Sequence, residues 1–468
     1  MGRFSIGAEP AGLGRGGRKK GLQTEIETGI VEEIQALLGR QSLRDLDFEA
    51  VEIAARRQAL RLAARALEQR VNADTSDQAG PELACRCGNP AQYRGRHDKT
   101  FESVLGPLRL ERAYYYCAQC QSGFCPRDHQ WRLEMFSLTP GVLRMTGSAA
   151  ALGSFVEGSG LLHELAGVEV SASQVERAAE ALGAEIAADE RLYVEPMGEV
   201  APTMYLGMDG TGVPVRTSEV AGRAGKRPDG SAKTREAKLV TIWSAESRDD
   251  EGRPQRDPGS VTYSAAIESA ASLDTNPDRS DFAERVLREA TRRGFTAAPR
   301  CAVLGDGSAW IWNTAQELFP QAIPILDRYH AKDALHRTAH SIFGATNPEA
   351  KTWATARCAE LDDGKLQAIV HALRLQAGSS PEAIKCALYI FRNRHRMRYP
   401  KFHALGLCTS TGVVEAGCKV AIGTRLKRAG MHWTTAGANS IIALRCCKLS
   451  GRYEDFWERR APQIAAAA

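Results

Sequence analysis

The spacing of apolar residues divides the chain into a helical N-terminal part and a C-terminal part in which helices and strands alternate. Ala and Leu recur at helical spacing in FEAVEIAARRQALRLAARALEQRV, within a helical pattern over about 24–72, and a second helical pattern covers 137–192. Beyond residue 200, short apolar runs predict strands in MYLGMDGTGVPVR, AKLVTIWSAE, GSVTYSAAI, CAVLGD and AIPILD. RSDFAERVLREATRRGF and SAWIWNTAQELF predict helices between them. We therefore expect an α/β fold for the C-terminal part.

Helical patterns return after the last predicted strand. Residues 328–398 are mostly helical in pattern, and 411–447 are helical with Gly interruptions. We expect five parts in the chain. The first three are a disordered basic tail at 1–22, a helical region and linker at 23–80, and a zinc-ribbon-like β module at 84–130. A helix-turn-helix-like DNA-binding region at 137–195 follows, and then an α/β domain at 200–460 with a helical insertion at about 328–408.

The helix-turn-helix outline lies in HELAGVEVSASQVERAAEALG, where the apolar turn Gly-Val-Glu-Val separates two helical patterns. Ser171 or Ser173 is expected to be the N-cap of the second helix. Any short helical hairpin has the same outline, so a DNA-binding motif and a purely structural hairpin are both open.

Composition excludes several classes of protein. The chain has 468 residues, 43% of them hydrophobic, and no run of 18 apolar residues, so we expect no membrane span. The first residues contain no apolar h-region after their charges, so we expect no secretion. A net charge of +5 does not by itself indicate a polyanionic partner. Twelve Cys are too few for a disulfide scaffold of this length. A reducing cytoplasm, with some thiols bound to a metal, fits better.

Four cysteines in the predicted β module have the spacing of metal ligands. They form a Cys-x-Cys pair and a Cys-x-x-Cys pair, 29 residues apart, on either side of a predicted hairpin. Four thiolates at the base of a hairpin can close a tetrahedral zinc site and stabilise a module with a small core. Free buried thiols are the alternative. The expected zinc ligands are Cys85, Cys87, Cys117 and Cys120, and the substitutes for them are Cys125, His97 and His129.

Three acidic residues occur in unusual surroundings. Asp209 lies in YLGMDGTGV at the end of an alternating apolar run, although Asp-Gly between apolar runs also predicts a hairpin turn. Asp306 follows a buried strand and precedes a helix, where it could line an α/β site or cap the helix. Glu415 lies in an early turn of a later helix, where a pair with Lys419 is the alternative role. Together these carboxylates can converge at one end of a sheet and bind Mg²⁺.

The charge distribution points to a nucleic acid. Residues 385–460 contain 15 Lys and Arg against four acidic residues, a local excess of +11. A basic segment around an isolated Glu is what a phosphate-backbone groove with an embedded metal ligand needs, and a solvated basic face is the alternative. The side chains that we expect to contact DNA are Lys419, Arg425, Lys427, Arg428, His432 and Trp433.

Over roughly residues 40–460, the chain resembles the ISKra group of bacterial insertion-sequence transposases, with the shared motifs in the same order. The resemblance is carried by CGNPAQYRGRHDKTFESVLGPLRLERAYYYC, YLGMDGTGVPVR, VLGDGSAWIWN with ILDRYHAKDAL, and VVEAGCKVAIGTRLKRAGMHW followed by ANSIIALRCCKLSGRYEDFW. It implies an RNase H-like catalytic core with a helical insertion before the last acidic residue. It also implies a DDE metal site, with Asp209 on the first strand, Asp306 after the fourth and Glu415 on the helix after the insertion.

The resemblance implies a function as well. A DNA transposase of this kind would bind the ends of an insertion sequence and, with Mg²⁺ or Mn²⁺, catalyse two-metal-dependent strand cleavage and strand transfer. It would act as a homo-oligomer on double-stranded DNA in the nucleoid of the bacterial cytoplasm. Asp327 and His330 in LDRYH are further candidates for the metal neighbourhood, with a core-facing or capping role as the alternative for His330. The alternative function is a non-catalytic DNA-binding protein derived from a transposase.

Overall fold

The computed structural model describes residues 47–133, 136–194, 200–225, 227–270, 279–376, 378 and 380–460. The expected tail at 1–22 and the first part of the predicted helical region lie outside the described residues. The described chain forms two compact units. The N-terminal unit comprises described residues of 47–145 and 159–170, and the C-terminal unit those of 146–158 and 171–460. The stretch 137–195 is therefore divided between the two units.

Four antiparallel strands form the sheet of the N-terminal unit, in the order β1-β2-β3-β4. They are β1 (Glu82–Ala84), β2 (Pro90–Ser103), β3 (Gly106–Cys117) and β4 (Ser122–Phe124), and the short helix α3 (Pro126–Trp131) follows. β2 and β3 form the long hairpin that the sequence predicts. In β3, Leu108 and Leu110 are buried and Arg109 between them is exposed, which is the alternation of a sheet with one covered face.

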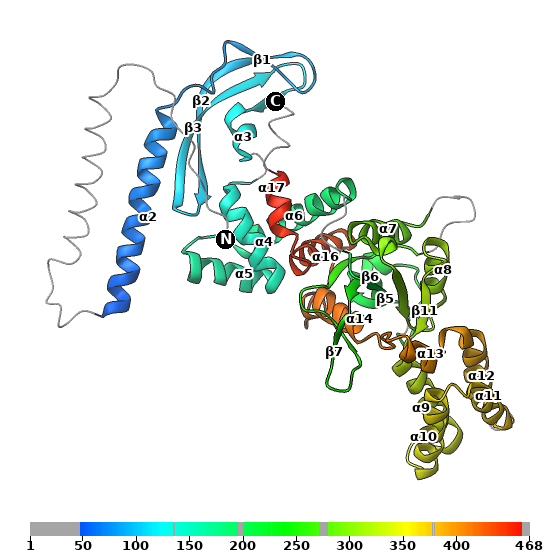
Figure 1. The fold of residues 1–468 in the computed structure, drawn as a ribbon. Coiled ribbons are helices and arrows are strands. Elements are labelled where there is room, and N and C mark those ends of the chain that lie inside the picture. The colour runs from blue at the N-terminus through cyan, green and yellow to red at the C-terminus, as the bar shows by residue number, and fades with distance from the viewer. Residues whose placement is uncertain are drawn as a thin grey trace. The chain divides into compact units, whose positions relative to one another are not determined.

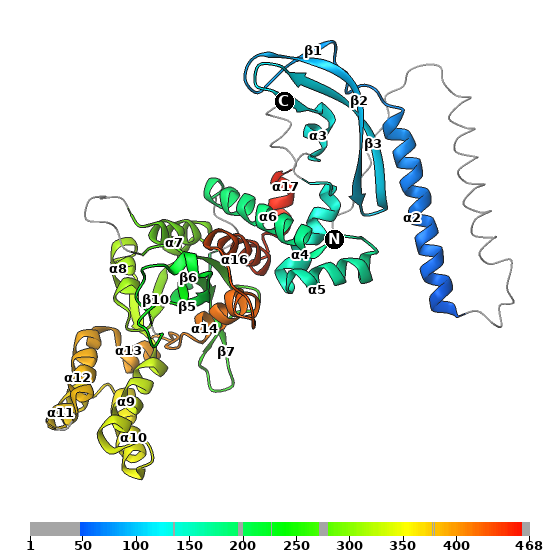
Figure 2. The same ribbon diagram turned by 180° about the vertical axis from the view of Figure 1, so that it is seen from behind.

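The helix α2 (Phe48–Asn72) packs against β3, as Figures 1 and 2 show. Its two buried residues, Ala64 and Val71, belong to a cluster that also contains Phe101 and leucines of β3. The Asn72 side chain accepts a hydrogen bond from one β3 backbone N–H and donates to a β3 carbonyl, both at 2.9 Å. The remaining faces of α2 are largely exposed, so the helix presents polar side chains along most of its length.

The chain then passes through α4 (Pro140–Leu152), α5 (Phe155–Leu161) and a π-helical turn (Leu162–Ala166) to α6 (Ala172–Leu192). Ser171 is the N-cap of α6, which confirms one of the two predicted caps. The Gln174 N–H donates to the Ser171 hydroxyl, and the Ser171 N–H donates to the Gln174 side chain. α6 packs closely on α16 (Thr435–Leu449). A Cβ at Gly183 of α6 would lie 2.0 Å from the Ser440 carbonyl oxygen, so only glycine allows this approach.

A five-stranded mixed sheet forms the centre of the C-terminal unit, in the order β11-β10-β5-β6-β9. β5, β6 and β9 are antiparallel, whereas β10 and β11 are parallel to β5. The strands are β5 (Thr203–Pro214), β6 (Thr234–Ser244), β9 (Thr262–Ala266), β10 (Arg300–Gly305) and β11 (Ile323–Leu326). All five correspond to predicted strands.

The strand β5 continues through Asp209 and Gly210 without a turn. Asp209 pairs with Leu239 of β6, and Gly210 with Lys238. The alternative interpretation of Asp-Gly as a hairpin turn is therefore wrong. The hairpin connecting β5 to β6 instead follows Pro214, five residues later.

Helices cover both faces of this sheet (Figures 1 and 2). α7 (Asp281–Arg292) and α8 (Ala309–Leu318) lie on one face, and α14 (Gly412–Gly417) and α16 lie on the other. Residues of successive strands and helices, such as Leu206, Val240 and Phe282, form one buried core. A Cβ at Gly207 of β5 would lie 2.1 Å from a methyl group of Val414, so the missing side chain there lets α14 approach the sheet.

A body of helices separates β11 from α14, which agrees with the helical pattern predicted at 328–398. Its elements are α9 (Arg328–Phe343), α10 (Pro348–Asp362), α11 (Leu366–Leu375), α12 (Pro381–Asn393) and α13 (Tyr399–Ala404).

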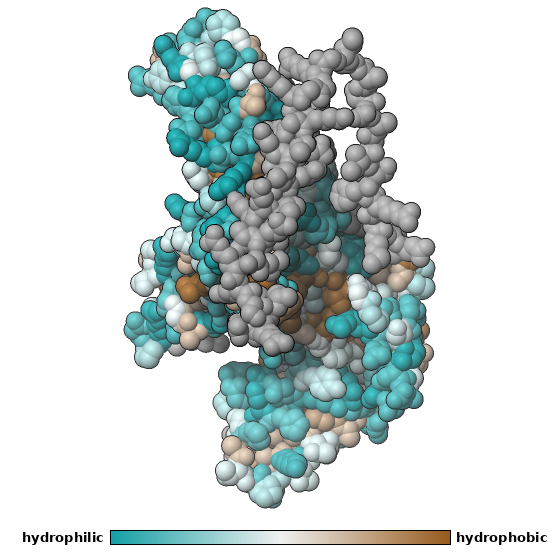
Figure 3. Space-filling view, turned by 90° about the vertical axis from the view of Figure 1, so that its left-hand side faces the viewer, coloured by the Kyte–Doolittle hydropathy of each residue, from teal (hydrophilic) through white to brown (hydrophobic). Residues whose placement is uncertain are grey.

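Hydrophilic residues cover most of the described surface on the face that Figure 3 draws. Within the described part of the chain, none of the helices is both long and apolar enough to cross a membrane.

Candidate active site

Aspartates lie side by side on neighbouring strands at one edge of the C-terminal sheet. Leu304 of β10 pairs in parallel with Gly207 of β5. Two residues further along each chain, Asp306 follows the end of β10 beside Asp209 of β5. Continuing this register by two residues brings Asp306 beside Asp209, and the charge of Asp306 raises the pKa of Asp209.

The next strand adds a third aspartate. Gly305 of β10 pairs with Leu326 of β11. The Asp327 backbone N–H donates to the Gly305 carbonyl at 2.9 Å, so the pairing extends one residue beyond β11. Asp327 therefore lies beside Asp306, and β5, β10 and β11 together present a row of three aspartates.

Glu415 lies near these aspartates on α14, the helix that packs against the sheet at Gly207. Asp327, His330 and Glu415 each place one potential ligand atom within 4.8 Å of the others. His330 Nδ1 lies 3.4 Å from Asp327 Oδ1 and 3.6 Å from Glu415 Oε1. In the described chain, Asp209 and Asp306 stay outside this tightest group, although the charge of Asp306 affects the pKa of both Asp209 and His330.

Thr411 links two of these carboxylates, and the sequence analysis did not identify it. Its backbone N–H and its hydroxyl both donate to Asp327 Oδ2, and its hydroxyl lies 3.4 Å from Glu415 Oε1. Thr411 is the N-cap residue of α14 but makes no side-chain capping bond. The available signal was a capping residue four positions before the candidate Glu.

The pKa values reflect burial and close charges. Burial raises the pKa of the Asp209 carboxyl, and the nearby Asp306 adds to the rise. Burial would also raise the pKa of Asp327, but hydrogen bonds donated by His330 and Thr411 outweigh it and lower that pKa. The hydrogen bond to Asp327 is the main reason why the pKa of His330 rises to about 9.

The donor set fits a divalent cation. The carboxylates offer hard oxygen ligands of the kind that Mg²⁺ and Mn²⁺ prefer, and the imidazole nitrogen is a ligand for transition ions. His330 Nδ1 is buried and faces Asp327 and Glu415, so it must lose its proton before it can bind a cation. Asp327 is 1% exposed while Glu415 is 54% exposed, so the group is open on one side only.

Two of the aspartates also accept backbone hydrogen bonds at the start of a helix, and for Asp306 this is close to the capping role given as its alternative. Asp306 Oδ1 accepts a hydrogen bond from the Ser308 N–H at 2.7 Å, at the start of α8. Asp327 is the N-cap of α9 and accepts from the His330 N–H at 2.8 Å. Glu415 differs, because its ion-pair partner within the described residues is His330 rather than Lys419.

The six side chains expected to contact DNA divide into buried and exposed ones. Arg425 and Trp433 are buried: the Arg425 Nε donates to the Ala150 carbonyl at 2.9 Å, and its guanidinium lies against the rings of Phe155 and Trp433. These two residues therefore hold the segment in place. Four of the six are exposed, namely Lys419, Lys427, Arg428 and His432.

Folding offsets much of the local charge excess at 385–460. Several cations of this segment form ion pairs with acidic residues from other parts of the chain. A count of charges along the sequence misses these distant partners. These pairs are Arg428–Glu157, Arg452–Glu289, Arg459–Asp189 and Arg460–Glu185. Exposed cations of the segment without an acidic partner in the described chain are Arg392, Arg394, Arg398, Lys401, Lys419 and Lys427.

A cavity of about 570 Å³ adjoins Asp306 and His330. Residues of α9 and α12 line its other side, including Arg337, Lys385 and Tyr389. The inserted helices therefore form one wall of the space in front of the carboxylates.

The four expected zinc ligands of the N-terminal unit lie together. Cys85 Sγ is 3.5 Å from Cys120 Sγ, Cys87 Sγ is 3.6 Å from Cys117 Sγ, and all four sulfurs lie within 4.8 Å of one another. Zn–S bonds of about 2.3 Å in a tetrahedron place sulfurs about 3.8 Å apart, so these separations fit zinc. Hydrogen bonds from Asn89 lower the pKa of the Cys87 thiol to about 6, which favours the thiolate.

Comparison with known proteins adds little. No protein-family model and no curated protein matches the chain. Among solved structures, the chain is similar to the Drosophila P element transposase in its strand transfer complex. The identity is 12% and the TM-score 0.22, over 68% of this chain and 80% of that chain. A likeness at this TM-score carries no conclusion about this chain.

Proposed function

We propose that the C-terminal unit is the RNase H-like core of a DNA transposase that cleaves and joins DNA strands with a divalent metal. The observation that carries the proposal is the row of Asp209, Asp306 and Asp327 on adjacent strands, with Glu415 above it from α14. Within the described chain, His330 is the one ion-pair partner of these four carboxylates, so placing them together is costly unless a further cation binds there.

The sheet supports the RNase H-like assignment. Numbered in chain order, its strands have the order 3-2-1-4-5, with the first three antiparallel and the last two parallel to the first. This is the arrangement of an RNase H-like core. The helical insertion between the fifth strand and the helix of Glu415 agrees with the family that the sequence resembles.

We assign the DDE roles to Asp209, Asp306 and Glu415, which would hold the metal ions. Two ions at such a site stabilise the attacking and leaving oxygens of an in-line displacement at a phosphate. Asp327 and His330 complete the neighbourhood of Glu415, and Thr411 orients the two carboxylates that it contacts. The buried Asp327 is fixed in position, whereas the exposed Glu415 faces the side from which a phosphate can enter.

Exposed cations beside the carboxylates favour DNA as the substrate. Lys427 donates to the Thr211 hydroxyl, two residues beyond Asp209 on the same face of β5. Lys419 is exposed one helical turn beyond Glu415. These side chains would contact backbone phosphates on either side of the scissile bond.

In the N-terminal unit, the cluster of Cys85, Cys87, Cys117 and Cys120 would hold a structural zinc ion. The role is structural because four protein ligands leave no open coordination position. We also expect the chain to act as a homo-oligomer, because an element has two ends that must be joined to one target.

A nicking assay tests the proposal. Purified full-length protein is incubated with a supercoiled plasmid that carries the DNA flanking its coding sequence, with Mg²⁺, Mn²⁺ or EDTA. Metal-dependent nicks at fixed positions near the element ends are expected. DNA binding without any metal-dependent cleavage would favour the alternative, a non-catalytic DNA-binding protein derived from a transposase.

A further inference from the structure

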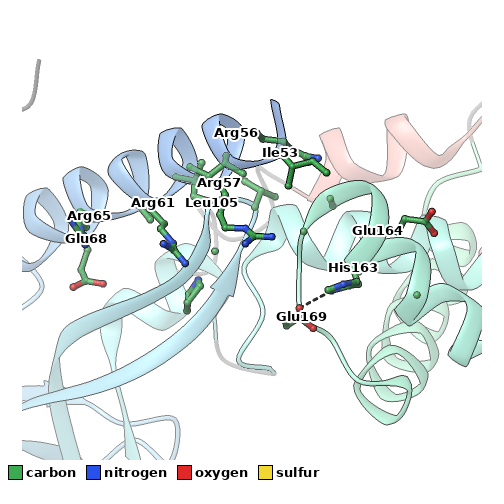
Figure 4. A pocket seen from close by; sticks show the side chains of 18 residues that line it. Ile53, Arg56, Arg57, Arg61, Arg65, Glu68, Leu105, His163, Glu164 and Glu169 are labelled. Atoms are coloured by element: carbon green, nitrogen blue, oxygen red, sulfur yellow. Dashed lines mark hydrogen bonds and ion pairs between the residues drawn. The ribbon is translucent and has the colours of Figure 1, made fainter. Parts of the chain in front are cut away.

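A groove of about 1000 Å³ runs along α2 in the N-terminal unit, distant in the sequence from every residue of the proposed active site. One wall is a face of α2, the floor is the tip of the β2–β3 hairpin, and the other wall is the segment 160–169 (Figure 4). The buried Ala64 anchors α2 against the hairpin, and Glu68 Oε2 accepts the Arg109 backbone N–H at 2.7 Å. The wall that α2 forms is therefore fixed by packing and hydrogen bonds.

Arginines line the α2 wall. Arg57, Arg61 and Arg65 follow one another at intervals of four residues, so they form a row along one face of the helix, and Figure 4 shows them on the side of the groove. Like charges at this spacing repel one another and destabilise a helix. Arg57 and Arg61 are exposed and make no ion pair or hydrogen bond with any described residue. A bound anion would remove this repulsion.

The opposite wall of the groove, formed by residues 160–169, carries carboxylates instead of arginines. Arg56 donates to the Leu165 carbonyl at 2.9 Å, which ties α2 to this wall. Glu169 pairs with His163 at 2.7 Å, and Glu164 also lines the groove. The carboxylates favour cations on their side, so an anionic occupant must lie along the arginine row.

We propose that this arginine row binds the sugar–phosphate backbone of double-stranded DNA. An α-helix rises 1.5 Å per residue, so Arg57 to Arg65 spans about 12 Å, enough to contact several successive phosphates. Extended polyanions are bound more tightly by such a row than single anions, because each contact releases counterions. The identification of the occupant as DNA rests on the proposed function, whereas the groove and its charges do not. We expect binding at this site to be independent of DNA sequence, because the arginines contact only the sugar–phosphate backbone of the DNA.

The test measures binding of the full-length protein to a fluorescent duplex by anisotropy, over a series of KCl concentrations and in EDTA, so that cleavage plays no part. The test variant is Arg57→Ala/Arg61→Ala, which keeps good helix formers at exposed positions and should fold normally. The slope of log K against log salt should become less steep by about 0.9 per arginine that contacts a phosphate. The matched control is Arg70→Ala, an exposed arginine of α2 outside the groove, for which the slope should not change.

A second variant tests occupancy of the groove itself. Glu164→Gln/Glu169→Gln removes negative charge from the opposite wall, so DNA should bind more tightly if it occupies the groove. An unchanged slope for Arg57→Ala/Arg61→Ala, an unchanged affinity for Glu164→Gln/Glu169→Gln, or tighter binding of duplex RNA than of DNA would overturn the inference. The plasmid-nicking assay keeps the two proposals apart. Groove-dependent binding without nicking would contradict only the proposed catalysis, and nicking without groove-dependent binding would contradict only the groove.

Discussion

Thr411 donates both its backbone N–H and its hydroxyl to one carboxylate oxygen of Asp327. The two residues are far apart in the sequence, since Asp327 ends a strand and Thr411 begins the helix of Glu415. The helical body at 328–404 separates them. These hydrogen bonds join the far side of the insertion to the sheet edge, so they determine where Glu415 lies relative to the aspartates.

Replacing Thr411 should therefore impair the site without removing a metal ligand. Thr411→Val keeps the shape of the side chain but loses the hydroxyl donor, and we expect metal affinity and nicking to fall by about 10–100-fold. Thr411→Ser retains the hydroxyl and should preserve most of the activity. Isothermal titration with Mn²⁺ and the plasmid assay measure the two effects. Equal activity of the Val and Ser variants would show that the hydroxyl does not position the carboxylates.

The pKa of His330 predicts a pH dependence of stability in the metal-free protein. Its pKa is about 9 in the folded protein, above the value of about 6.5 expected for an unfolded chain. The protonated imidazole therefore stabilises the fold fully below about pH 6.5, and this stabilisation is lost as the pH rises through about 9. In EDTA, the difference in Tm between the wild type and His330→Gln should be largest below about pH 6.5 and should shrink as the pH rises through about 9. A constant difference across this range would contradict the ion pairs of His330.

Arg425 and Lys427 should behave in opposite ways although both were expected to bind phosphate. Arg425→Ala removes a buried side chain that contacts two aromatic rings, so it should destabilise the C-terminal unit by about 2–4 kcal/mol. Lys427→Ala should leave Tm almost unchanged and make the salt dependence of DNA binding less steep by about one unit. Thermal unfolding and anisotropy separate the two effects. A stable Arg425→Ala protein with a less steep salt dependence would restore Arg425 as a phosphate contact.

The zinc site predicts one tightly bound zinc ion per chain by elemental analysis. Cys117→Ser should lose the metal and unfold the β module, because the module has only a small core of its own. Cys125→Ala is the control, since Cys125 is buried in the same module but outside the sulfur cluster. Wild-type protein that is free of zinc and still has a folded module would refute the assignment.

Most of the elements of the fold could be predicted from local patterns, because amphipathic periodicity and strand length are local properties. The strands around Asp209 and Asp306 and the cap at Ser171 are examples. The partners of charged side chains could not be predicted in this way. Arg452 and Arg460 look like parts of a basic surface in the sequence, yet their acidic partners belong to helices roughly 160 to 280 residues earlier.

The candidate site was predictable only as a set of isolated carboxylates. The sequence indicates Asp209, Asp306 and Glu415 as the metal ligands, and Asp327 and His330 only as further candidates for the metal neighbourhood. The strand register adds what the sequence lacks, since it aligns Asp327 with Asp306. The position of Thr411 four residues before Glu415 indicates only the start of a helix, whereas its contact with Asp327 depends on how the inserted helices return to the sheet.

The most direct test of the central claim is the nicking activity of Glu415→Gln measured beside its DNA binding. Gln keeps the size and helix propensity of Glu but removes the charge that would hold a divalent cation. We predict that DNA binding survives or tightens, because a negative charge leaves a basic surface, while Mg²⁺-dependent nicking falls by orders of magnitude. Asp209→Asn and Asp306→Asn should have the same effect, and double variants should be no worse, since parts of one metal site fail together. Retained Mg²⁺-dependent nicking by Glu415→Gln would contradict the account.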